Sequence, residues 1–123
     1  MNSQDPAPSF LFLFRDPADL AEPQPAQVAA LMAWIENVKA QGQLLAGGSL
    51  APAPACVLRG PRGSTITDGP FPESKEVFAG FMQVAAQDFE RALALAQGCP
   101  ILRAGTSLEV RQVAPTDGRP HPL

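Results

Sequence analysis

Five apolar residues follow one another near the start of the chain, at positions 10–14. Successive side chains of an extended strand point to opposite faces, so an uninterrupted apolar run needs cover on both sides. The run therefore predicts a central strand of a sheet, buried on both faces. Arg15, Asp16 and Pro17 end it, because proline cannot donate to the ladder and restricts the residue before it.

A helix is predicted over residues 28–39, where apolar side chains recur at intervals of three and four. On a helix with 3.6 residues per turn they form one stripe, made of Val28, Leu31, Met32, Ile35 and Val38. Pro25 suits the first turn, and Gly42 suits the left-handed conformation that ends a helix. Such a stripe is expected to cover a sheet.

The remainder of the chain continues this alternation of strands and helices. Further strands are predicted over 44–50, 77–86 and 107–113, a hairpin over 55–67, and a second helix over 88–97 capped by Asp88. In order this gives β-α-β, a hairpin and β-α-β. We therefore predict an α+β fold, a ferredoxin-like split β-α-β sandwich with an inserted β-hairpin and both helices on one face of an antiparallel sheet.

Length and charge narrow the classes of protein to which the chain can belong. Its 123 residues predict one domain over 9–114, with an extended lead-in over 1–8 and a Pro-rich tail over 115–123. A formal net charge of -3 argues against a nucleic-acid binder, which needs clustered basic residues. No apolar run approaches the roughly 18 residues that span a bilayer, so we expect no membrane partner and a cytoplasmic protein.

The thiols and the single histidine suggest no metal or cofactor. Cys56 and Cys99 lack a neighbouring ligand at metal-binding spacing, and we expect both to be buried free thiols. His121 lies in the tail, so the serines of the predicted domain have no histidine base for a Ser-His-Asp arrangement. We therefore predict neither a metal site nor a bound cofactor.

The stretch TDGPFPESKE, at positions 67–76, points to a family. Asp68, Gly69, Pro70 and Phe71, followed by Glu-Ser-Lys-Glu, resemble the signature of the DGPF-domain proteins within the YCII-related family. The order of predicted elements is similar to that family over nearly the whole chain. The resemblance implies a link to extracytoplasmic-function sigma factors. The residues themselves indicate a homodimer through the open sheet face, because positions 10–14 are apolar on both faces and the two helices can cover only one. Proteins of similar architecture often pair two such sheets into a dimeric α/β barrel, with a pocket near the subunit boundary.

Asp68 is the first candidate for a functional group, since its carboxylate could act as a general base or bind a cation. The alternative is a turn residue that bonds backbone amides, as Asp before Gly often does. Lys75 and Ser74 are candidates for holding an anionic group, and a surface ion pair of Lys75 with a neighbouring glutamate is the simpler description. Arg15 and Asp16 could also reach a pocket from the end of their strand, and a solvated strand end is the simpler description.

Gly47 and Gly48 interrupt the second predicted strand. Paired glycines at such a position mark a bulge or a close approach of backbones, and a ligand could use the gap. A bend where the strand crosses its neighbour is the alternative.

Two hypotheses for function follow. The first is an uncharacterised small-molecule-binding protein, which could also act as a weak acid/base enzyme in a pocket near Asp68. The second is a non-catalytic interaction or regulatory module linked to an extracytoplasmic-function sigma factor. A pocket lined by polar side chains would favour the first, and a filled core with an exposed apolar edge would favour the second.

Overall fold

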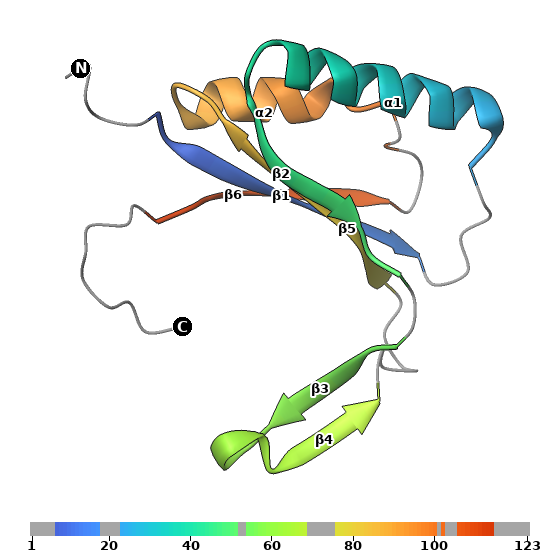
Figure 1. The fold of residues 1–123 in the computed structure, drawn as a ribbon, viewed down its shortest axis with the longest axis vertical. Coiled ribbons are helices and arrows are strands. Elements are labelled where there is room, and N and C mark those ends of the chain that lie inside the picture. Colours follow the sequence, from blue (N-terminus) through green and yellow to red (C-terminus); the bar gives the residue numbers. More distant parts are fainter. Residues whose placement is uncertain are drawn as a thin grey trace.

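A computed structural model describes residues 7–17, 23–51, 54–68, 76–100, 102 and 106–114. An antiparallel sheet has the strand order β2-β5-β1-β6, built from β1 (Ser9–Pro17), β2 (Leu44–Ser49), β5 (Glu76–Ala85) and β6 (Ser107–Gln112). Helices α1 (Pro25–Ala40) and α2 (Phe89–Gln97) lie together on one face of this sheet (Figure 1). The α+β class, the antiparallel sheet and the inserted hairpin are thereby confirmed.

Strand β1 lies in the interior of the sheet, paired with β5 on one side and β6 on the other. Phe10 and Phe12 are fully buried beneath the helices. Leu11 and Leu13 point to the other face and are only half-buried. The central position is confirmed. Within a single chain the helices cover one face alone, so burial of the other face depends on a partner and stays a prediction.

Helix α1 begins at Pro25 and is followed by Gly42, whose φ of +72° is the left-handed conformation expected there. Val38 is fully buried, and Trp34 and Ile35 pack against the core. Two members of the predicted stripe were wrong, because Val28 is 41% and Met32 52% exposed. The helix turns Trp34 toward the core instead, since burying an indole removes more apolar area from water than burying a methionine.

Helix α2 begins as predicted. The Asp88 carboxylate accepts a hydrogen bond of 2.8 Å from the Arg91 backbone N–H, which satisfies an amide that has no partner within the helix. Ala92 and Ala96 are buried, and small side chains here let the helix approach the sheet closely.

The two thiols differ in their surroundings. Cys99, just beyond α2, is buried as predicted, whereas Cys56 at the start of β3 is exposed. The prediction for Cys56 was wrong because its strand belongs to a hairpin that no helix covers.

Strands β3 (Cys56–Arg59) and β4 (Thr65–Asp68) pair into this hairpin, which projects away from the sheet (Figure 1). Gly60 and Gly63 adopt positive φ at the turn between them. Neither of the two helices in the described part of the chain combines the length and apolar character needed to cross a membrane.

Candidate functional site

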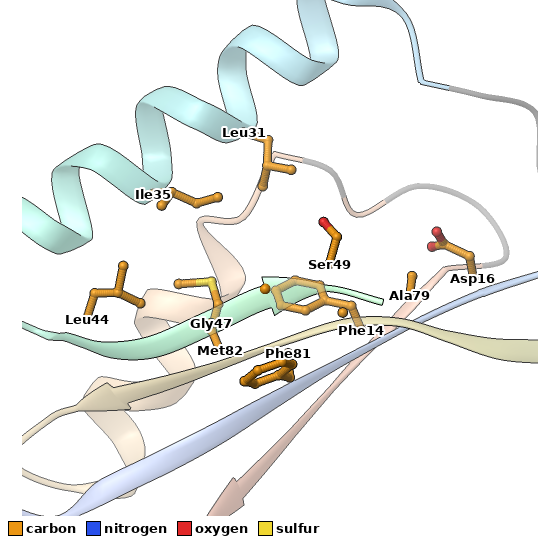
Figure 2. Close-up of a pocket in the computed structure, with 12 residues that line it drawn as sticks. Phe14, Asp16, Leu31, Ile35, Leu44, Gly47, Ser49, Ala79, Phe81 and Met82 are labelled. Carbon is orange, nitrogen blue, oxygen red and sulfur yellow. The ribbon is translucent and has the colours of Figure 1, made fainter. Parts of the chain in front are cut away.

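A cavity of about 360 Å³ lies between α1 and the β2–β5 side of the sheet (Figure 2). Its volume falls within the range of small-molecule sites. Its described lining consists of Phe14, Asp16, Leu31, Ile35, Leu44, Gly47, Gly48, Ser49, Ala79, Gly80, Phe81 and Met82.

Glycines on two neighbouring strands create room for this cavity. Gly47 pairs with Met82, and Gly80 pairs with Ser49, so both glycines lie in the part of the sheet that α1 faces. A side chain at either position would occupy space close to the sheet. A Cβ on Gly47 would lie 3.2 Å from Met82 Cγ, and one on Gly80 would lie 2.9 Å from the Gly48 carbonyl oxygen. The strands therefore approach each other at a distance that suits glycine.

One end of the cavity is apolar. Leu44 and Ile35 lie at this end, from β2 and α1, and Met82 lies beside them on the sheet (Figure 2). The Phe81 ring points to the opposite side of the sheet from Met82, as alternation along β5 requires (Figure 2). This end offers surface suited to an aliphatic or aromatic group.

The other end carries two polar side chains, Asp16 and Ser49 (Figure 2). Alternation along β1 places Asp16 on the same side as Phe14, while Ser49 ends β2. The Leu50 backbone N–H donates a 2.9 Å hydrogen bond to the Ala79 carbonyl, which continues the β2–β5 pairing beyond Ser49. A regular strand end therefore positions the hydroxyl group.

The Asp16 side chain is half-buried and has no ion-pair or hydrogen-bond partner in the part of the chain that the structure describes. Burying part of a carboxylate without a partner is unfavourable, because water is removed and nothing replaces its hydrogen bonds. The site is therefore able to gain from a ligand that brings a cation or a hydrogen-bond donor.

The predicted site residues fall in different places. Gly47 and Gly48 line the cavity, although their role toward a ligand stays a prediction. Arg15 lies on the other face of the sheet, where it forms a 3.1 Å ion pair with Glu109 and stacks 4.6 Å from the centre of the Phe78 ring. These contacts leave Arg15 outside the described lining.

The candidates around the DGPF signature lie at the edge of the described residues or outside them. Asp68 ends β4, where its backbone pairs with Cys56, but its side chain lies outside what the structure describes. Ser74 and Lys75 also lie outside the described residues. Their proposed roles remain predictions.

Sequence reasoning gave no binding role to Ser49 or Gly80. Asp16 was named beside Arg15 as able to reach a pocket, and it lines the cavity because it follows Phe14 by two residues and shares its face. Ser49 and Gly80 come together through the pairing of β2 with β5, and the strand pattern alone does not reveal that register. Among the described residues, no group of three or more His, Cys, Asp or Glu side chains could hold a metal ion.

The profile of the YCII-related domain matches residues 9–117 of the chain. Proteins with curated descriptions gave no match. The matched range contains every helix and strand described above, from β1 to β6, and therefore the whole described lining of the cavity.

Proposed function

This chain belongs to the YCII-related family, and we propose that it binds a small molecule in the cavity between α1 and the sheet. The observation that supports this most directly is the combination of glycines beneath the cavity with a polar end at Asp16. Only Asp16 and Ser49 among the described lining residues have polar side chains, fewer than this hypothesis expected from the sequence, but an apolar pocket with a few polar groups is typical of small-molecule sites.

Acid/base catalysis is a finer form of this proposal. A carboxylate in a cavity can accept a proton from a bound substrate if the two come within hydrogen-bond reach. Asp16 and Asp68 are the two candidates, Asp16 for its place in the cavity and Asp68 for its place in the family signature.

Filling the cavity tests the binding proposal. The probe is 2-phenylethanol, which is uncharged, and we expect it to bind wild type with a dissociation constant of about 1 mM because so small a molecule makes few contacts. We expect Leu31→Trp to place an indole in the cavity and abolish this binding. The measurement is a titration followed by the backbone amide signals of Gly47 and Met82.

Met32→Trp is the matched control, because Met32 is the next residue of α1, is 52% exposed and does not line the cavity. It should bind the probe as wild type does. Absence of any probe-dependent change in the wild-type signals, or equal binding by the Leu31 variant, would contradict the proposal. Asp68→Asn belongs in the same titration, since lost binding at an unchanged melting temperature would give that carboxylate a ligand role.

We also propose that two copies pair through the sheet face that lacks helices. Leu11, Leu13 and Phe81 lie near one another on this face, since Leu13 pairs with Phe81 across β1 and β5. Charged side chains flank them on the β6 side, where Glu109 lies between Arg15 at 3.1 Å and Arg111 at 3.3 Å. An apolar centre with a polar rim is the usual composition of a protein interface. The result would be a dimeric α/β barrel.

An interaction module is the second candidate function, and the β3–β4 hairpin favours it. Leu58 and Ile66 are cross-strand partners and are 60% and 66% exposed. Isolated two-stranded hairpins are marginally stable in water, so packing against a partner would stabilise this one. A sigma factor of the extracytoplasmic-function class is the partner that the family resemblance suggests.

Isothermal titration calorimetry of the chain with a purified sigma factor of that class tests this second function by measuring the dissociation constant of the complex. We expect Leu58→Ser to weaken the interaction about tenfold or more, since an exposed leucine buried at an interface contributes more than 1 kcal/mol. Leu45→Ser is the control, because Leu45 is similarly exposed, at 54%, on a different strand. Equal binding by wild type and Leu58→Ser would exclude the hairpin as the contact surface.

A further inference from the structure

We propose that the cavity between α1 and the sheet selects a compact primary amine, with its ammonium group at Asp16 and its apolar body toward Leu44 and Ile35. This inference rests on the proposed function, because it names the chemical class of the ligand for the same cavity.

The charge of the cavity supports a cationic ligand. Asp16 is the single charged side chain among the described lining residues. The adjacent cation on the strand, Arg15, is directed to the opposite sheet face and is held there by Glu109 at 3.1 Å. Asp16 is therefore half-buried without a compensating positive charge in the described part of the chain. A ligand ammonium supplies that charge, while a ligand carboxylate would place two negative charges together.

The hydrogen-bonding groups at the polar end of the cavity suit an ammonium group. An ammonium has three donors and no acceptor, and a carboxylate and a hydroxyl both accept hydrogen bonds. Asp16 and Ser49 lie at the same end of the cavity and offer these acceptors (Figure 2). Hydrogen bonds between two charged groups are stronger than those between neutral groups, so an amine should bind more tightly than an alcohol of the same shape.

The apolar end limits the rest of the molecule. Leu44, Ile35 and Met82 offer surface without a polar side chain, and the volume of about 360 Å³ is near the lower end of ligand sites. A second charged group on the ligand would lose its hydration there without gaining a partner. The ligand class is thus a monoamine with one short aliphatic or aromatic body.

Three probes of nearly equal shape test this inference, namely 2-phenylethylammonium, 2-phenylethanol and phenylacetate. Each is titrated into wild type at neutral pH and followed by the amide signals of Gly47 and Met82. We expect the ammonium probe to bind about tenfold more tightly than the alcohol, a ratio that one charge-assisted hydrogen bond can supply. Phenylacetate should bind more weakly than the alcohol.

Asp16→Asn should remove the preference and leave the ammonium and alcohol probes with similar dissociation constants. Glu36→Gln is the matched control, because it removes the same charge from an exposed position on α1 outside the described lining. It should keep the tenfold preference. Ser49→Ala gives a second variant at the polar end, and we expect it to weaken the ammonium probe about threefold, as for one neutral hydrogen bond of moderate strength.

The outcomes separate the two proposals. If the alcohol or phenylacetate binds wild type as tightly as the ammonium probe, the amine assignment is wrong and small-molecule binding stands. If none of the three changes the cavity signals, the binding proposal itself is wrong and the amine assignment falls with it. A preference that persists in a folded Asp16→Asn protein would also overturn the amine assignment, because the charge would then have another origin.

Discussion

Gly80 is the residue at which the backbone of the cavity leaves least room for change. A Cβ there would lie 2.9 Å from the Gly48 carbonyl oxygen, so the strands must move apart to accept it. We expect Gly80→Ala to lower the free energy of unfolding by about 1–3 kcal/mol, the usual cost of overpacking. Chemical denaturation of the variant beside wild type measures this loss.

Gly48→Ala is the matched control for this prediction. A Cβ on Gly48 would meet the Phe81 ring at 3.6 Å, an ordinary contact. Its effect should stay within about 0.5 kcal/mol, as for most surface substitutions. Equal losses in the two variants would show that strand propensity, rather than close approach of the backbones, determines the need for glycine.

At the scale of elements, local chemistry made most of the fold predictable. The apolar run at 10–14 became β1, and Asp88 caps α2 as its type and position predicted. Register was harder to predict. The pairing of β1 with β5 shifts between Phe14 and Arg15, and that of β2 with β5 shifts between Leu44 and Ala46. Such irregularities depend on neighbouring strands, and the sequence of one strand does not encode them.

The orientation of α1 shows a second limit of the same kind. Val28 and Met32 fit the helical period as well as Ile35 does, yet they are exposed. Trp34 packs toward the core instead, with its indole nitrogen 3.6 Å from where a Cβ on Gly98 would lie. Trp34 therefore lies next to the end of α2, and the rotation of α1 depends on tertiary packing. The same rotation turns Leu31 and Ile35 toward the cavity, which explains why the site was harder to predict than the elements around it.

At the scale of the whole molecule, the cavity and the proposed dimer surface lie on opposite faces of one sheet. Gly47 and Met82 belong to the helix-covered face, and Leu11 and Leu13 to the open one. Phe81 belongs to the described lining, while its ring points to the open face (Figure 2). Sequence reasoning placed a pocket near the subunit boundary, whereas the described cavity is bounded by α1. A ligand beneath α1 and a second copy on the open face would therefore contact the same strands from two sides without competing for space.

Leu11→Glu tests the proposed dimer while leaving the isolated chain able to fold. Leu11 is opposite Arg111 on one neighbouring strand and Gln83 on the other, so a glutamate there has a cationic neighbour and access to water in the monomer. In a dimer the apolar centre would have to bury this charge. We expect wild type to sediment as a dimer at about 10–50 µM protein, a range suited to ordinary dimer affinities, and Leu11→Glu to sediment as a monomer. Met32→Glu, on the exposed side of α1, should remain dimeric. A wild type that is strictly monomeric in this range, or a Leu11→Glu protein as dimeric as wild type, would refute pairing through this face.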